Sequence, residues 1–183
     1  LLLSRRFFFD MIERNRRNDP FQLGGVRMKL ETCSKSAFAV IGKEGSTSDG
    51  QGFIQTLWAE ANAHFSEVQP LAKKDENGNL VGIWGAMSDV SRSFKPWEDN
   101  FSKGLYLAGV ECVDEAEAPE GWTKWIIPGH EYLCAEVENG NTFSEVLDYM
   151  RTNAIPLAGA VHEFTCSGTG KNYLFFPIEK RNR

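Results

Sequence analysis

The sequence has no apolar run that approaches the roughly 20 residues needed to cross a membrane. The apolar triplets at residues 1–3 and 7–9 are short, and Arg5 and Arg6 separate them, so they do not resemble a signal peptide. We therefore expect a cytoplasmic protein without membrane contact.

Cysteine and histidine are scarce, and neither is spaced as metal ligands usually are. No C-x-x-C pair occurs, and three of the four cysteines fall in strand-like runs, so we expect reduced core thiols. The cysteines are Cys33, Cys112, Cys134 and Cys166. His64, His130 and His162 show no zinc-ligand spacing. The sequence thus predicts no metal and no other cofactor.

Charge is unevenly distributed along the chain. The formal net charge is −5, but residues 1–29 hold seven basic and three acidic residues, so they carry +4 and the remaining residues −9. Such an acidic body argues against nucleic acid as the main partner and favours cationic or neutral ligands over phosphates.

Hydrophobic and aromatic residues are plentiful for a chain of 183 residues. Hydrophobic residues make up 42%, which predicts a real core of one domain or of two small halves. Thirteen Phe and five Trp can fill that core, or they can line a pocket for flat organic molecules.

Hydrophobic periodicity and turn residues predict the order strand, helix, strand, strand twice. The expected elements are strands at 38–42, 80–87 and 104–112 with a helix at 52–68, then strands at 122–127, 130–137, 156–166 and 172–179 with a helix at 142–153. The second helix should begin with a capping box, in which Thr142 is the N-cap and Glu145 the third helical residue. Before the repeats we expect a helix over 1–18, a linker at 23–25 and an edge strand at 30–33.

Residue similarity between the two series supports a duplication. Residues 80–84 resemble residues 157–161, and residues 103–111 resemble residues 171–179. The predicted fold is α+β: two β-α-β-β units, antiparallel sheets, two main helices on one side and a cleft between the halves. The alternative is a coincidental similarity inside an ordinary α+β domain.

One carboxylate, Glu163, stands in the otherwise apolar run 156–166. A charge in such a run is costly unless it is paired, so Glu163 has either a structural partner or a ligand. The repeat alignment places Ala86 at the position of Glu163. By strand alternation we then expect Trp84 and Glu163 to face one cleft, so that one half offers an aromatic ring and the other an anion.

Five segments in this order resemble the effector-binding domains of AraC-type and MerR-type transcription regulators, also called GyrI-like domains. They are residues 38–43, the pair Leu57 and Trp58, residues 104–111, residues 125–132 and the strand of Glu163. The resemblance covers about residues 28–181. It implies a pseudo-twofold domain whose central pocket binds lipophilic, often cationic molecules, with Glu163 on the pocket floor amid aromatic residues.

The resemblance also implies a division of the chain. Residues 28–183 would be the effector-binding domain, with repeats at about 36–113 and 121–181. Residues 1–27 would be a basic helical segment or linker, too short to bind DNA as a domain. The expected partner is a small-molecule effector. DNA would be reached only through an upstream domain, and a homodimer stays open.

The expected ligand-binding residues combine the anion with aromatic walls. They are Glu163, Trp84, Trp97, Tyr106, Tyr132 and Phe175, whereas Trp58 is expected in the core. The first hypothesis is a sensor without chemistry of its own. The alternative is a hydrolase of electrophilic natural products, in which Glu163 is the general base and Tyr106 or Tyr132 the proton donor or orienter. A gyrase-directed inhibitor and a tetrapyrrole binder are further alternatives.

Overall fold

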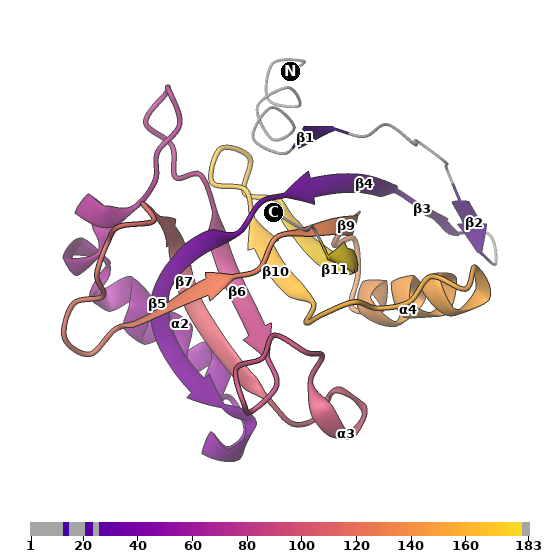
Figure 1. The fold of residues 1–183 in the computed structure, drawn as a ribbon, viewed down its shortest axis with the longest axis horizontal. Coiled ribbons are helices and arrows are strands. Elements are labelled where there is room, and N and C mark those ends of the chain that lie inside the picture. The colour runs from indigo at the N-terminus through magenta and orange to yellow at the C-terminus, as the bar shows by residue number, and fades with distance from the viewer. Residues whose placement is uncertain (1–12, 15–20, 24–25, 181–183) are drawn as a thin grey trace.

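A nine-stranded antiparallel sheet forms the frame of the protein in a computed structural model, which describes residues 13–14, 21–23 and 26–180 (Figure 1). The strand order is β1-β4-β9-β11-β10-β6-β7-β5-β8. The strands are β1 (Glu13–Arg14), β4 (Leu30–Lys35), β5 (Phe38–Ser46), β6 (Ile83–Ser88), β7 (Leu105–Cys112), β8 (Thr123–Ile127), β9 (His130–Glu136), β10 (His162–Thr165) and β11 (Asn172–Lys180). A separate hairpin pairs β2 (Phe21–Leu23) with β3 (Val26–Met28).

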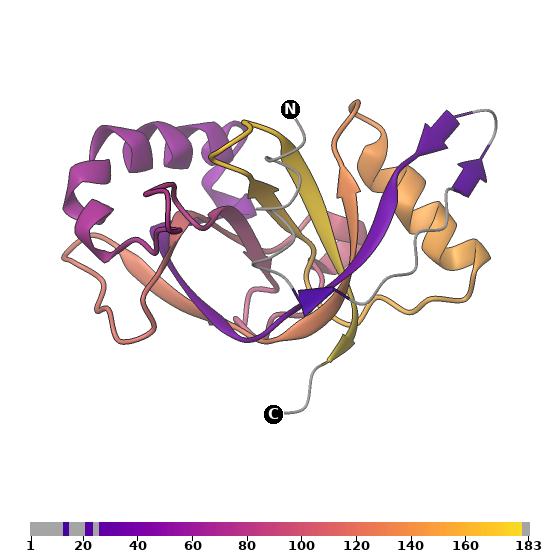
Figure 2. The ribbon, with the colours of Figure 1, turned by 90° about the horizontal axis from the view of Figure 1, so that it is seen from above.

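The duplicated unit expected from the sequence is confirmed. The first repeat is β5, α2 (Phe53–Ala63), β6 and β7, and the second is β9, α4 (Thr142–Thr152), β10 and β11. The repeats meet where β6 pairs with β10 at the centre of the sheet. Both helices lie on the same side of the strands, well apart from each other (Figure 2).

The strand that precedes each repeat pairs with the other repeat. β4 leads into β5 but pairs with β9, and β8 leads into β9 but pairs with β5. The residue pairing keeps one register where β4 continues into β5 and β8 into β9, because Lys35 lies opposite His130 and Phe38 lies opposite Ile127. The halves are therefore joined along two long curved ribbons as well as through the central strand pair (Figure 2).

The two faces of the sheet bury separate clusters because side chains alternate along each strand. The face away from the helices holds an aromatic cluster in which Trp84 contacts Phe38, Phe164 and Phe175 at ring-centroid distances of 4.8, 4.7 and 5.2 Å. The other face packs against α2 in the first half and against α4 in the second. We call these the inner face and the helix face.

A buried ion pair lies on the inner face. Lys35 Nζ is 3.1 Å from both carboxylate oxygens of Glu111, and the two side chains are 8% and 3% exposed. Trp84 Nε1 donates to Glu111 at 3.1 Å. Lys73 Nζ lies 3.9 Å from the same carboxylate. Loss of the Glu111 charge would leave Lys35 buried without this partner, which typically costs several kcal/mol.

Both main helices differ in extent from the sequence prediction. The first was expected over 52–68, but α2 ends at Ala63 and the chain continues as the 3₁₀ turns Phe65–Glu67 and Gln69–Leu71. Pro70, which has no amide hydrogen to donate, lies in the second turn.

The capping box predicted for the second helix is wrong. Asn141 is the N-cap of α4, and the Thr142 hydroxyl instead donates to the Asn139 carbonyl at 3.0 Å.

Two strand predictions also need correction. The strand expected over 156–166 is reduced to β10, because Ala158 and Ala160 donate to the carbonyls of Pro177 and Phe94 around Pro156 and Gly159. The expected edge strand at 30–33 is not an edge, since β4 lies between β1 and β9.

The N-terminal predictions are tested only where the structure describes residues 1–28. Within the helix expected over 1–18, Glu13–Arg14 forms a strand, and the rest lies outside the described residues. The linker expected at 23–25 falls on the β2–β3 hairpin, and its residues 24–25 also lie outside them.

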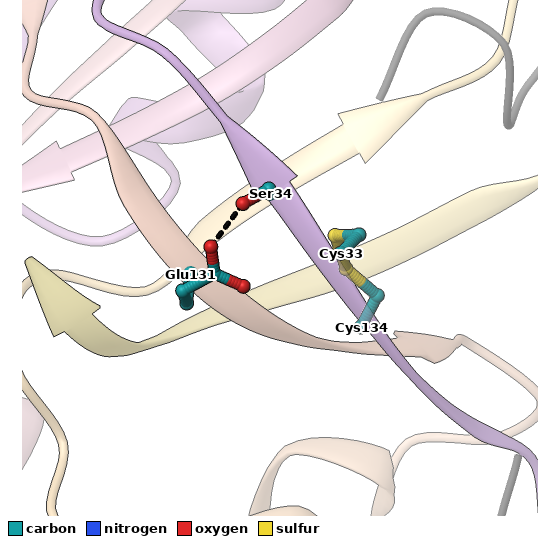
Figure 3. The surroundings of a disulfide bond; sticks show 4 residues. All are labelled: Cys33, Ser34, Glu131 and Cys134. Carbon is teal, nitrogen blue, oxygen red and sulfur yellow. Dashed lines mark hydrogen bonds between the residues drawn. A yellow bond between two sulfur atoms is a disulfide. The ribbon is translucent and has the colours of Figure 1, made fainter. Parts of the chain in front are cut away.

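A disulfide joins Cys33 of β4 to Cys134 of β9 (Figure 3). The expectation of four reduced thiols is therefore wrong for this pair, while Cys112 and Cys166 are free. The strand register explains why these two cysteines can bond. Cys33 lies opposite Tyr132, so Cys134 is its diagonal neighbour on the adjacent strand. Because the two cysteines are separated by 101 residues in the sequence, the sequence alone did not indicate that they lie close together.

Removal of this disulfide should destabilise the protein. Reduction, or Cys33→Ala, releases a long closed loop and should lower the free energy of unfolding by about 3–5 kcal/mol, measured by chemical denaturation with and without dithiothreitol. Cys166→Ala is the matched control and should keep the sensitivity to reductant. Equal stability of wild type and Cys33→Ala, each with and without reductant, would contradict the assignment.

His162 of β10 is buried on the inner face as a neutral hydrogen-bond acceptor. Its Nδ1 accepts from the Met87 backbone amide at 3.1 Å. Burial, aided by the nearby His130, lowers the pKa of His162 to about 3. The folded state therefore disfavours protonation, and stability is fully present above the unfolded pKa of about 6.5 and is lost as the pH falls toward 3.

Mild acid should consequently destabilise the wild type through His162. Between pH 6.5 and pH 5 we expect a loss of about 2 kcal/mol in the free energy of unfolding, measured by urea denaturation. His162→Gln keeps an acceptor for the Met87 amide without a titrating ring, so most of this slope should vanish. An unchanged slope in that variant would exclude His162 as the source.

Candidate functional site

The central strand pair determines which residues share a face with Glu163. Glu163 lies opposite Gly85, and Phe164 lies opposite Trp84. Trp84 therefore belongs to the inner face and Glu163 to the helix face, so the expectation that they face one cleft is wrong. The cause is a one-residue error in the repeat alignment, which transfers every side chain of a strand to the other face.

The corrected counterpart of Glu163 is Met87. The alignment of residues 103–111 with 171–179 makes Tyr106 and Leu174 equivalent. Tyr106 lies opposite Met87 on β6, and Leu174 lies opposite Glu163 on β10. At matching positions of the pseudo-twofold frame, the first half thus carries a thioether and the second half a carboxylate.

Glu163 is held by a chain of hydrogen bonds from the first repeat. Trp58 Nε1 of α2 donates to the Tyr106 hydroxyl at 3.0 Å, and this hydroxyl donates to Glu163 Oε2 at 2.5 Å. Burial, with the neighbouring Glu163 charge, raises the pKa of Tyr106, so the phenol stays protonated as a donor. The Glu163 side chain itself is exposed rather than buried, although its strand is apolar.

Gly85 makes room for this hydrogen bond. Tyr106 reaches Glu163 from β7 across β6, and a Cβ atom at Gly85 would collide with the Tyr106 hydroxyl and the Glu163 carboxylate. The equivalent position in the second repeat, by the corrected alignment, is Val161. At this position the pseudo-twofold frame therefore has no side chain in the first repeat and a valine side chain in the second.

An apolar pocket adjoins the carboxylate on the same face. Met87 lies two residues beyond Gly85 on β6, one same-face step from the Glu163–Gly85 pair, and Val161 lies two residues before Glu163 in the chain. The pocket has a volume of about 130 Å³. Its lining residues are Met87, Trp97, Phe101, Phe143 and Val161. Glu163 and this pocket together form what we call the central groove, between α2 and α4.

The residues expected at one site are divided between the two faces. Trp97 and Tyr106 lie on the helix face with Glu163. Trp84, Tyr132 and Phe175 lie in the inner cluster. Phe175 and Phe176 face opposite sides, as expected for neighbours on a strand. The Tyr132 hydroxyl donates to the Pro128 carbonyl at 3.4 Å and does not contact Glu163.

Sequence reasoning missed several residues of the groove. Trp58 was expected in the core, and its indole nitrogen could have signalled a polar partner at the edge of that core. Gly85, Phe101, Phe143 and Val161 carried no signal of their own. Their proximity depends on the pairing of β6 with β10, which is a contact between repeats.

The described part of the chain holds neither a cluster of metal ligands nor a helix that could span a membrane. Among these residues, no three His, Cys, Asp or Glu side chains gather as a metal site would need. Within the same residues, none of the helices has the length and apolar character of a membrane span.

Several solved structures share this fold. SAV2435 bound to tetraphenylphosphonium superimposes with a TM-score of 0.56 at 14% identity, over 84% of this chain and 94% of that one. The EcmrR C-terminal domain gives a TM-score of 0.57 at 12% identity, over 84% and 99%. A transcription regulation protein from Staphylococcus aureus MU50 gives 0.52 at 15% identity, over 85% and 99%.

These similarities establish the fold, which is the GyrI-like fold expected from the sequence. At such low identity they do not carry over a ligand or a role. No protein-family model matches the sequence. A search of curated proteins finds no match either.

Gly85→Ala should disrupt the arrangement around Glu163. The added methyl group displaces the Tyr106 hydroxyl, so we expect a loss of about 1–3 kcal/mol in the free energy of unfolding. Tyr106→Phe should have less effect in the Gly85→Ala background than in the wild type, as measured by a double-mutant cycle. Gly168→Ala, which adds a methyl group to open space, should be neutral. Full additivity would show that Gly85 does not support the hydrogen bond.

Proposed function

We propose that this chain is a small-molecule-binding domain that takes lipophilic cations in the central groove. The observation that supports this most directly is the Glu163 carboxylate on the groove floor, fixed by Tyr106 and open to solvent. Glu163 receives its hydrogen bond from a neutral phenol, so its negative charge is not neutralised by that contact.

The surroundings of Glu163 suit an organic cation better than a metal ion. Tyr106 is buried and holds the carboxylate, Trp58 beside it is partly exposed and supplies aromatic surface, and the adjoining pocket is apolar. An apolar setting strengthens the attraction between the carboxylate and a poorly hydrated cation, and aromatic rings add cation–π contacts of about 0.5–2 kcal/mol each. The structural neighbour SAV2435 was solved with tetraphenylphosphonium, a molecule of this class.

The geometry argues against a tyrosine acid in the hydrolase alternative. In the hydrolase alternative, Tyr106 would give a proton to the substrate, but its hydroxyl donates to Glu163 and its pKa is raised. Tyr132, the other candidate donor, lies on the inner face. Tyr106 is therefore better suited to orient Glu163 than to act as an acid.

Within this proposal the groove serves as the effector site of a transcription regulator. The support is that the neighbours include a transcription regulation protein from Staphylococcus aureus. DNA would be contacted through another domain, and the cytoplasmic location and the boundary at residue 28 are part of the same proposal. A homodimer is compatible with it.

Binding of tetraphenylphosphonium tests the proposal. We expect isothermal titration calorimetry to detect binding to the wild type and a loss of about tenfold or more in affinity for Glu163→Gln, because the ion pair is removed. The variant should fold as well as the wild type, since the substituted side chain is exposed. Glu138→Gln is the matched control, an exposed carboxylate outside the groove, and should bind normally.

Two outcomes would count against the proposal. If lipophilic cations fail to bind the wild type, the groove is not a cation site. If Glu163→Gln binds as tightly as Glu138→Gln, the carboxylate does not provide the recognition. Mass analysis of recovered electrophilic compounds separates binding from hydrolysis, because a hydrolase would return an altered compound.

A further inference from the structure

We propose that the pocket beside Glu163 is a subsite for one uncharged aromatic ring of the ligand. The inference rests on the proposed function and makes it more specific: a preferred ligand is a cation that places one phenyl-sized ring in this pocket, a short linker away from its charge. Pocket size, spacing, pseudo-symmetry and the construction of the pocket wall support it.

Size limits the occupant to a single ring. The volume of about 130 Å³ is close to that of an engineered apolar cavity of about 150 Å³ that binds benzene. Whole drug-sized ligands need pockets of roughly 300 Å³ or more. The pocket therefore takes one arm of a ligand, and the rest of the molecule must lie elsewhere in the groove.

Spacing places the charge next to the ring. Met87 lies one same-face step along β6 from Gly85, the residue opposite Glu163. Such a step is about 7 Å in an antiparallel sheet. A cationic centre at Glu163 and a ring over Met87 are thus separated by a linker of a few carbon atoms.

The pseudo-twofold frame gives the two subsites opposite character. Met87 occupies in the first half the position that Glu163 occupies in the second, and both face the groove. A methionine side chain adapts to aromatic rings and makes favourable sulfur–aromatic contacts. The asymmetry of the floor therefore matches a ligand that is charged at one end and aromatic at the other.

The outer wall of the pocket is built by a turn in an unfavourable conformation. Asp99, Asn100 and Phe101 have φ values of 50°, 57° and 62° within the short helix α3 (Glu98–Phe101). Left-handed backbone is tolerated by Asp and Asn but is costly for a bulky residue such as Phe101. The turn brings Phe101 into an edge contact with Phe143 of α4, at 5.3 Å between ring centroids.

The remaining wall residue, Trp97, is also fixed. Its Nε1 donates to the Leu105 carbonyl at 2.9 Å, and its ring lies over Gly104, where a side chain would collide with it. Upstream, Asp89 accepts bonds from Ser88, Ser91, Ser93 and Lys95, which lower its pKa although burial opposes this. The loop that carries the aromatic wall is thus organised before any ligand arrives.

Matched cations test the subsite. Tetramethylammonium carries the charge alone, and (3-phenylpropyl)trimethylammonium adds one ring on a three-carbon linker. We expect the phenyl compound to bind the wild type at least about tenfold more tightly, by calorimetry. A naphthyl analogue should lose most of this gain because a second ring exceeds the pocket.

Two variants separate the subsite from the charge. Val161→Phe reduces the space in the pocket and should lower the affinity for the phenyl compound more than the affinity for tetramethylammonium, so that the ratio of the two affinities falls. Glu163→Gln should weaken both cations and keep their ratio. Circular dichroism and melting curves establish that each variant is folded, and Val161→Leu, a smaller filling, should reduce the advantage by an intermediate amount.

The outcomes distinguish the two proposals. Equal affinity of the two cations for the wild type, with Glu163→Gln weakening both, overturns the subsite and leaves the cation site intact. If neither cation binds, the proposed function fails, and the neutral probe 3-phenylpropan-1-ol decides about the pocket alone. A ring-current shift of the Met87 methyl resonance with this probe supports the subsite, and an unchanged resonance overturns it.

Discussion

The hydrogen bond between Tyr106 and Glu163 depends on the absence of a side chain between them. Tyr106 belongs to β7 and Glu163 to β10, and the strand between them presents Gly85 at the point of crossing. A donor and an acceptor from different repeats can meet there only because the sheet surface is lowered by one missing Cβ. The position and orientation of the carboxylate in the groove follow from this gap.

Glu111 and Glu163 show how one residue type is used on the two faces of a sheet. Glu111 is 3% exposed and is neutralised by Lys35 in a closed cluster, where its charge contributes to a fixed structure. Glu163 is exposed and is held by a neutral donor. The first arrangement needs no further partner, whereas the second leaves a negative charge in a partly apolar groove, where a cation would be stabilised.

The sequence predicted the frame well because periodicity, turns and the internal repeat are local signals. They give the repeated β-α-β-β order and the two main helices, and the carboxylate at Glu163 stands out in an apolar run. The face of Trp84 could not be obtained in this way, because an alignment error of one residue reverses a strand. Likewise the Cys33–Cys134 bond and the Phe101–Phe143 contact join elements that are distant in the chain, so composition and spacing do not indicate them.

The exchange of β4 and β8 between the repeats has a mechanical consequence. β4 is hydrogen-bonded and disulfide-linked to β9 of the second repeat, although the chain continues from β4 into β5 of the first. Displacement of one repeat against the other would therefore act on the junction between Lys35 and Phe38, where the two ribbons cross. The N-terminal side of that junction would move with the half that carries Glu163.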